Sequence, residues 1–325
     1  MSSPNVSLVM PGRNAGVTLG ACLEAVCPML ERGELREIVF VDDGSTDNTC
    51  EIAAQYPVKI VAGRGEGPGA ARNRGITVAQ GEWIWFIDSD CVAEPDALSI
   101  LLEHTDDDPG IAAIGGSYGN MRPDSLLACL IHEEIVVRHN RMPPVVDFLA
   151  SFNVLFRHDA LNEIGGFDPR FLKAQDAELA YRARAHSYTL RFDARSRVKH
   201  FHPTRLLSYL STQRDQGYWR MFLYRAYPER IMGDSYSGLT DYAQPPLALA
   251  TLALFPISLL IPTLRGPLLA TVGLLFACQL PMARLIAPRL GIPRAIAFVF
   301  MSTLRSFARA LGMAHGALAA FFMRT

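Results

Sequence analysis

The final part of this sequence lacks acidic residues altogether. None of its 32 Asp and Glu residues follows Asp241, whereas seven of its 31 Lys and Arg residues do, and all seven are Arg. Residues 1–241 therefore hold 24 basic against 32 acidic residues, a net charge of −8, and residues 242–325 carry +7. A long apolar segment whose charged residues are all Arg is typical of a membrane region facing an anionic leaflet, which argues against a second soluble domain.

Two other features are absent. The six Cys residues show no Cys-x-x-Cys spacing, which argues against a zinc knuckle, and we interpret them as reduced thiols used as small apolar residues. The N-terminal residues 1–5 lead directly into a strand, without the charged start and apolar core of a signal peptide. We therefore expect the first domain to stay in the cytosol.

Strand and helix patterns alternate through residues 6–87. The predicted strands are 6–10, 37–41, 58–62 and 83–87, and the predicted helices are 17–30, 47–56 and 70–80. This alternation predicts an α/β domain with a mostly parallel, Rossmann-like sheet. The strand 83–87 is apolar throughout, and we expect it to be buried on both faces in the middle of that sheet.

Two carboxylates, Asp88 and Asp90, follow this strand at once. In an open α/β sheet ligands bind outside the carboxyl ends of the strands, and residues i and i+2 of a strand point the same way. Two oxygen ligands on one side suit Mg²⁺ or Mn²⁺ carrying a diphosphate, because such ions complete their shell with phosphate oxygens and water. The alternative is a solvated turn or a helix cap.

Polar loops at other strand ends agree with a ligand site. Pro11–Asn14 follows the first strand, and Asp42 and Asp43 follow the second. Carboxylates accept hydrogen bonds from a base or ribose, so the set favours a nucleotide. The loop Gly63–Gly69 either presents backbone N–H groups, with Arg72 one turn into the next helix, or is a flexible connector. It is not a dinucleotide fingerprint, since its glycine spacing is wrong and it follows the third strand.

Four motifs in this order and spacing resemble the nucleotide-sugar half of family 2 glycosyltransferases, which have the GT-A fold. The motifs are Pro11-x-Arg13-Asn14, Val41-Asp42-Asp43-Gly44-Ser45-Thr46-Asp47, Gly69-Ala70-Ala71-Arg72-Asn73-x-Gly75 and Asp88-Ser89-Asp90. The resemblance implies a nucleotide-sugar site, and the residues it implies there are Pro11, Arg13, Asn14, Asp42, Asp43, Gly69, Arg72 and Asp88. It also implies that Asp88 and Asp90 bind the metal ion, Mg²⁺ or Mn²⁺.

The segment Gly165-Gly166-Phe167-Asp168, followed by Asp176, resembles the acceptor half of the same family. The resemblance implies that Asp176 is the general base, which takes the proton of an acceptor hydroxyl as it attacks the anomeric carbon in a single displacement with inversion. The residue before the base is commonly acidic in the family and is Gln175 here, which removes a negative neighbour. The alternative role for Asp176 is a helix cap paired with Arg184.

The segment 195–230 is basic and rich in aromatic residues, with eight Arg and Lys residues against Asp215 and Glu229. We expect it to meet anionic lipid or the phosphate of a lipid-linked acceptor; the adjoining apolar tail disfavours the competing partner, nucleic acid. His202 is a candidate metal ligand through the pair His200-x-His202, although such a pair is often structural. The Gln-x-x-Arg-Trp signature of processive synthases lacks its Arg before Trp219, so we expect one sugar per acceptor.

The apolar tail predicts a membrane region. Residues 245–264 carry no charge and are long enough to cross a bilayer core of roughly 30 Å. We expect a two-helix hairpin, 245–264 and 266–287, that returns the chain to Arg residues on the cytosolic side. Within 295–323, Arg305 and Arg309 lie on one helical face, and each would cost about 3 kcal/mol inside the bilayer. An amphipathic helix in the interface is therefore expected, with a third span as the alternative.

These features together predict a GT-A glycosyltransferase domain at residues 1–240 and a C-terminal helical membrane region at 241–325. The expected enzyme is inverting and multi-pass, and it moves one sugar from a UDP- or GDP-sugar to a lipid-linked acceptor at the cytosolic face of the inner membrane. The ending Met313–Leu318 is similar to the tail of succinoglycan-type bacterial glycosyltransferases, which favours polysaccharide biosynthesis. The alternatives are a polyprenyl-phosphate sugar synthase, a nucleotidyltransferase and a non-catalytic nucleotide-sugar-binding membrane protein.

Overall fold

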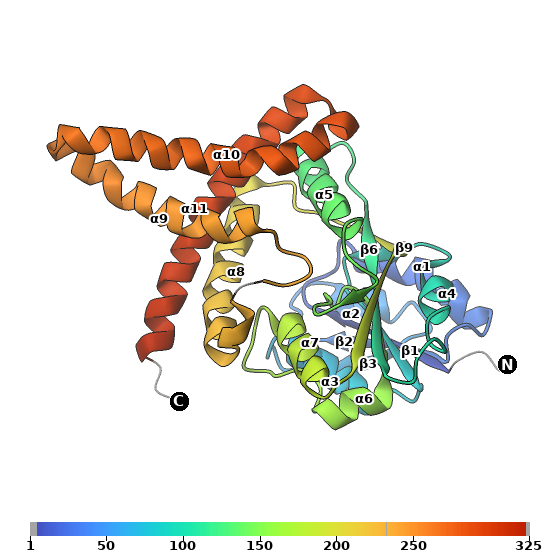
Figure 1. Cartoon of the computed structure of the whole chain (residues 1–325). Coiled ribbons are helices and arrows are strands. Elements are labelled where there is room, and N and C mark those ends of the chain that lie inside the picture. Colours follow the sequence, from blue (N-terminus) through green and yellow to red (C-terminus); the bar gives the residue numbers. More distant parts are fainter. Residues whose placement is uncertain (1–4, 232, 323–325) are drawn as a thin grey trace. The chain divides into compact units, whose positions relative to one another are not determined.

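The computed structural model of the chain describes residues 5–231 and 233–322 (Figure 1). Internal contacts divide it into two compact units: the first runs to Met121 and resumes at His139–Phe201, and the second comprises Arg122–Arg138 and the residues from His202 onward. This division differs from the predicted boundary at residue 240. The reason is that the helices at 126–139 and 206–226, which lie before that boundary, pack with the C-terminal helices.

The first unit is built on one mixed sheet with the strand order β3-β2-β1-β4-β8-β6-β9-β5, in which β7 pairs with β9. Its strands are β1 Val6–Gly12, β2 Glu37–Asp42, β3 Lys59–Ala62, β4 Trp83–Ile87, β5 Cys91–Ala93, β6 Ile111–Asn120, β7 Val145–Val146, β8 Asn153–Arg157 and β9 Thr189–His200. The first four strands in the order, β3 to β4, are parallel, whereas β8 runs antiparallel to both β4 and β6. The predicted Rossmann-like, mostly parallel half is confirmed.

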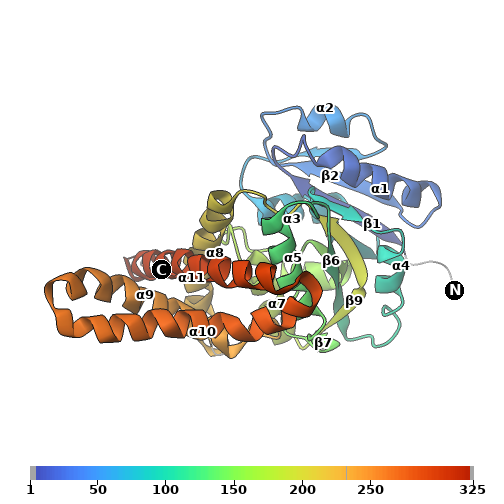
Figure 2. The same cartoon turned by 90° about the horizontal axis from the view of Figure 1, so that it is seen from above.

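Helices cover both faces of this sheet (Figures 1 and 2). They are α1 Leu19–Glu31, α2 Thr49–Ala53, α3 Pro68–Val78, α4 Ala97–Leu102, α6 His158–Ile164 and α7 Gln175–Ala185. Helices α1 and α4 contribute to one apolar cluster, and α3, α6 and α7 to another on the opposite face. Strand β4 supplies Trp85 to the first cluster and Phe86 to the second, so its complete burial follows from being apolar on both faces.

The second unit is helical. It contains nearly all of α5 Leu126–His139, together with α8 Leu206–Ala226, α9 Leu239–Leu260, α10 Arg265–Leu290 and α11 Ile292–Phe322, with short 3₁₀ turns at Pro228–Arg230 and Pro262–Leu264. Helices α8 and α11 approach with their backbones almost touching. A Cβ atom on Gly312 would collide with the carbonyl oxygen of Arg214, and one on Gly316 with that of Tyr218. Small residues therefore allow this close helix pair, as they do in membrane helices.

Three helices of this unit are long and apolar enough to cross a membrane: Leu239–Leu260, Pro262–Leu290 and Ile292–Phe322. The first two match the predicted hairpin, although α9 begins six residues earlier than the expected Pro245 and contains Pro245, Pro246 and Pro256. The third helix differs from the others in burial. In its most apolar 18-residue stretch 44% of the residues are buried, compared with 22% for each of the first two helices.

Candidate functional site

Arg72 is a buried cation at the edge of the sheet. It lies in the second turn of α3, its exposed fraction is 3%, and its Nη2 atom bonds to Asp88 Oδ1 at 2.5 Å. The Cζ atom of its guanidinium group lies 5.4 Å from the centroid of the Phe167 ring. Within the described residues, Nε and Nη1 of Arg72 have no hydrogen-bond partner. A buried guanidinium with two unused nitrogens is suited to bind an anion rich in acceptor oxygens.

The loop that carries Asp88 and Asp90 is fixed by α1. Thr18 Oγ1 donates a hydrogen bond of 2.8 Å to the carbonyl oxygen of Ser89, and Cys22 Sγ lies 3.3 Å from the same oxygen. The backbone N–H of Cys91 donates to the carbonyl oxygen of Asp88 at 2.9 Å. Both carboxylates are therefore held at the carboxyl end of β4, which is where the sequence places them.

Asp90 contacts the imidazole of His200, the last residue of β9. Strands β5 and β9 pair with Cys91 opposite His200, and His200 Nε2 lies 3.1 Å from Asp90 Oδ2. Ligand atoms of Asp90, Cys91 and His200 all lie within 4.8 Å of one another. Burial raises the pKa of the Cys91 thiol well above its ordinary value, so the thiol stays protonated. A carboxylate and an imidazole remain, a donor set that fits Mn²⁺.

The pKa values of the two carboxylates of this loop are shifted in opposite directions. Burial raises the pKa of Asp88 above its ordinary value; Arg72 opposes this shift and the negative charge of Asp90 adds to it. The pKa of Asp90 lies below its ordinary value: burial alone would raise it, but the hydrogen bond and the charge of His200 outweigh burial. Two acidic groups so close repel one another, and a cation between them would relieve that repulsion.

The nucleotide residues that the sequence predicts gather at the ends of β1 and β2, where Pro11 lies beside Val41 and Gly12 beside Asp42. Asn14 has φ 52°, its N–H donates to Ser45 Oγ, and its Oδ1 accepts from the N–H of Thr46, both at 2.8 Å. These bonds join the two loops. The guanidinium group of Arg13 extends to the next loop, where it would lie 3.6 Å from a Cβ atom on Gly65.

Asp43 has a different environment from the one expected. It is 4% exposed, and its carboxylate accepts three backbone N–H groups of the glycine-rich loop: Gly65 at 2.9 Å, Glu66 at 3.2 Å and Gly67 at 2.8 Å. The carboxylate oxygens of Asp42 accept the N–H of Ser45, each at 3.3 Å. The structure thus gives Asp43 the role of shaping the loop that precedes α3, and nucleoside contact by Asp43 stays a prediction.

Asn73 links the donor and acceptor motifs, a role that the sequence did not reveal. Its Nδ2 donates to the carbonyl oxygen of Phe167 at 2.7 Å, and its Oδ1 accepts the N–H of Phe167 at 2.8 Å. Gly166 has φ 66°, and a Cβ atom there would lie 2.6 Å from Asn73 Oδ1. The only available signal was that Asn73 follows Arg72 in one motif and Gly166 precedes Phe167 in another.

Asp176 is the second residue of α7, and its Oδ1 accepts the N–H of Ala177 at 2.9 Å. The start of α7 lies against the start of α3, because a Cβ atom on Gly69 would be 3.7 Å from the Cβ and Cγ atoms of Gln175. Arg184 donates through Nη1 to the carbonyl oxygen of Tyr188 at 2.9 Å. The predicted base is therefore next to the helix that carries Arg72.

His202 belongs to the second unit. It is 1% exposed there, and its ring centroid lies 5.6 Å from that of His132. The imidazole that contacts Asp90 in the first unit is that of His200. A metal-binding role for His202 therefore stays a prediction, and His200 is the member of the pair for which the structure supplies a contact.

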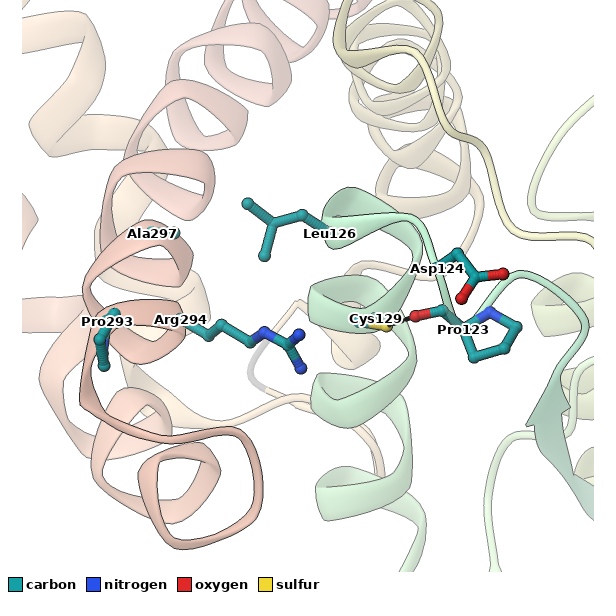
Figure 3. Close-up of a pocket in the computed structure, with 7 residues that line it drawn as sticks. All are labelled: Pro123, Asp124, Leu126, Cys129, Pro293, Arg294 and Ala297. Atoms are coloured by element: carbon teal, nitrogen blue, oxygen red, sulfur yellow. Dashed lines mark hydrogen bonds between the residues drawn. The ribbon is translucent and has the colours of Figure 1, made fainter.

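A pocket lies within the helical unit, between the starts of α5 and α11 (Figure 3). Its lining is mainly apolar, with Asp124 and Arg294 as its charged residues. One charge of each sign suits no particular anion or cation. The first unit therefore holds the stronger candidate site.

Residues 7–165 match the family model described as "Glycosyl transferase family 2". This segment is a family 2 glycosyltransferase domain. Over 107 residues the chain is 37% identical to the succinoglycan biosynthesis protein ExoO of Rhizobium meliloti, and this match covers 32% of this chain and 30% of that protein. The chain spans about a third of the length of the first curated relatives that it matches. The predicted resemblance is confirmed for this domain.

Solved structures show the same fold. The mannosyltransferase PcManGT of Pyrobaculum calidifontis, in complex with GDP-Man and Mn²⁺, is similar with a TM-score of 0.57 and 16% identity, covering 100% of this chain and 89% of that one. Glucosyl-3-phosphoglycerate synthase of Mycobacterium tuberculosis, in complex with Mn²⁺, UDP and phosphoglyceric acid, has a TM-score of 0.50 and 17% identity over 68% of this chain and 78% of that chain. At these identities the likeness shows the fold alone, and the GT-A fold is confirmed.

Proposed function

We propose that this chain is a metal-dependent, inverting glycosyltransferase that uses a UDP- or GDP-sugar. The observation that carries the proposal is Arg72, a buried guanidinium beside Asp88 whose Nε and Nη1 atoms have no partner among the residues that the structure describes. A nucleoside diphosphate supplies the acceptor oxygens that such a group requires. The family 2 domain and the nucleotide complexes of the two similar structures support this choice of anion.

In this proposal each residue has a distinct task. Arg72 binds the diphosphate and holds the negative charge that develops as the bond to the anomeric carbon breaks. Asp90 and His200, with Asp88 beside them, would hold Mg²⁺ or Mn²⁺. Such an ion neutralises the leaving diphosphate when it is bound. Asp176 accepts the proton of the acceptor hydroxyl as its oxygen attacks the anomeric carbon from the opposite face, which inverts the configuration.

The proposed acceptor is lipid-linked, and the proposed pathway is polysaccharide biosynthesis. Support comes from the three apolar helices and from the likeness to a succinoglycan biosynthesis protein. A polyprenyl-phosphate sugar synthase is the nearest alternative, since it would use the same donor site with a bare lipid phosphate as acceptor. A non-catalytic protein would have no need of Asp88, Asp90 and Asp176 together.

We propose that α9 and α10 cross the inner membrane as a hairpin and that α11 lies along its cytosolic face. Arg305, 4% exposed, forms an ion pair with Glu134 of α5, whose Oε1 also accepts from Arg138 at 2.8 Å. Arg309 Nε donates to Gln213 Oε1 of α8 at 2.7 Å. Protein therefore covers the polar face of α11, while the opposite face exposes apolar side chains to lipid; these are Ile296, Phe300, Leu304, Leu311 and Leu318.

Donor hydrolysis by the purified full-length protein tests the activity. A panel of UDP- and GDP-sugars, each with and without Mn²⁺, is expected to give one donor whose turnover requires the ion. Arg72→Lys keeps the charge but loses the planar fork, so we expect donor affinity to fall by about tenfold or more. Arg36→Lys, on an exposed arginine that bonds to Gln80, is the matched control. If no nucleotide sugar binds or turns over, the proposal is wrong.

A second experiment addresses the base. Asp176→Asn is expected to leave donor affinity within about threefold of wild type while transfer to a lipid-linked acceptor falls by about 10²- to 10⁴-fold, because the amide accepts no proton. Retained transfer would exclude Asp176 as the base. Product stereochemistry, measured by NMR on the transferred sugar, decides between inversion and retention.

A further inference from the structure

Gln175 is a buried amide with an unused oxygen. It is the first residue of α7 and 8% exposed, and within the part of the chain that the structure describes its Oε1 atom has no hydrogen-bond partner. Buried side-chain oxygens are nearly always paired in native folds. The residue before it, Ala174, has φ 62° and ψ 13°, a left-handed conformation that residues other than glycine rarely adopt. Backbone strain of this kind is often found at ligand sites.

Gln175 and Arg72 share the neighbourhood of Phe167. A Cβ atom on Gly69 would lie 3.4 Å from Phe167 Cβ and 3.7 Å from Gln175 Cγ. Arg72 follows Gly69 by three residues on the same side of α3, and its guanidinium group lies over the Phe167 ring. Arg72 and Gln175 therefore both lie near Phe167, at the start of α3.

The unused atoms are of opposite kinds, yet they do not bond to each other. Nε and Nη1 of Arg72 need acceptors, and Oε1 of Gln175 needs a donor. A ligand that satisfies both must carry acceptor oxygens next to a hydroxyl or amide N–H group. A sugar diphosphate has this arrangement, because its phosphate oxygens adjoin the hydroxyl groups of the sugar ring.

We propose that Gln175 recognises the donor sugar by accepting a hydrogen bond from one of its hydroxyl groups. This inference rests on the proposed function, and it makes Gln175 a residue that determines which sugar is used. An amide provides this acceptor without adding a negative charge close to Asp88 and to the diphosphate. A site built to accept a hydroxyl hydrogen bond rejects the analogue that lacks the hydroxyl, since its buried oxygen is then left unpaired.

The test measures the affinity of each protein variant for each donor analogue and compares the differences, as in a double-mutant cycle. The probes are the donor found by the hydrolysis panel, its monodeoxy analogues and the nucleoside diphosphate, and the measurement is Kd by calorimetry with Mn²⁺. Wild type is expected to bind one analogue about 10- to 100-fold more weakly than the parent donor. Gln175→Met keeps the side-chain volume but lacks the amide. This variant should bind the parent donor as weakly as wild type binds that analogue. Its affinity for the analogue should then be less than about threefold below its affinity for the parent donor. Gln175→Glu keeps an acceptor oxygen and should keep the discrimination.

Lys173→Met, on an exposed side chain two residues away, is the control, and it should match wild type for every probe. Equal affinity of all variants for the nucleoside diphosphate shows that the site is folded. If every deoxy analogue loses the same factor in wild type and Gln175→Met, the sugar-recognition role is wrong while the proposed function stands. If wild type binds neither nucleotide sugars nor nucleoside diphosphates, the proposed function itself is wrong.

Discussion

Replacing Asp43 by Asn distinguishes a residue that shapes a loop from one that contacts a nucleoside. The carboxylate accepts three backbone N–H groups in the structure, and an amide retains only one acceptor oxygen. If that oxygen keeps the bonds to Gly65 and Glu66, the new NH₂ group faces the N–H of Gly67, and one charge-assisted bond is lost. The loss is worth about 1.5–3 kcal/mol. In a unit of this size, it corresponds to a decrease in Tm of roughly 3–12 °C.

Thermal unfolding followed by tryptophan fluorescence measures this effect, because Trp83 and Trp85 lie in β4 of the same unit. Asp42→Asn is the matched control: its two bonds to Ser45 are long, at 3.3 Å, so the Tm should change by less than about 2 °C. Donor affinity should fall together with Tm in Asp43→Asn, since the loop leads into α3. An unchanged Tm with lost donor affinity would refute the loop-shaping role and favour direct nucleoside contact.

Three further predictions concern stability. Gly166→Ala places a Cβ atom 2.6 Å from Asn73 Oδ1 at φ 66°, so we expect a loss of at least about 2 kcal/mol, measured by chemical unfolding; an unchanged midpoint would contradict the close contact between Gly166 and Asn73. Glu134→Gln leaves Arg305 buried without its anion and should cost about 3–5 kcal/mol in detergent, whereas the double variant with Arg305→Met should recover most of it. The pKa of Asp193 falls to about 2: burial would raise it, but hydrogen bonds from Arg195 and His104 outweigh burial. Its contribution is complete above about pH 4 and is lost as the pH falls toward 2, so Asp193→Asn should flatten the acid unfolding curve in that window.

The strand ends of the first unit were predictable because their signal is local. An apolar strand such as β4 is recognised from five consecutive residues, and the carboxylates that follow it must then lie at the edge of the sheet. The same reasoning placed Arg72 in the first turns of a helix after a glycine-rich loop. The family resemblance implied that Arg72 and Asp88 belong to the same nucleotide-sugar site, and the structure provides a bond between them.

Features that depend on distant partners were not predictable. The segment 195–230 was described as a basic stretch, but it contains the end of β9 and the whole of α8. The many charged residues of this segment give neither element a clear local pattern. Both are stabilised by distant partners instead: β9 pairs with β6 and β5, and α8 is in close backbone contact with α11. Similarly, Arg305 was expected to be costly in an apolar helix, and only the position of Glu134 on α5 shows how its charge is balanced.

Three deviations from local rules in the first unit lie close together, at Arg72, Ala174 and Gln175. Arg72 and Gln175 keep buried polar atoms without a partner in the described part of the chain, and Ala174 adopts a left-handed conformation that an alanine does not favour. Each of these features lowers stability by itself, and a sequence selected for stability alone would remove them. Arg72 and Gln175 lie near Phe167, which Asn73 fixes to α3 through two hydrogen bonds. Stability lost at this point is explained if a ligand supplies the missing bonds, so ligand binding should raise Tm most in proteins that retain both Arg72 and Gln175.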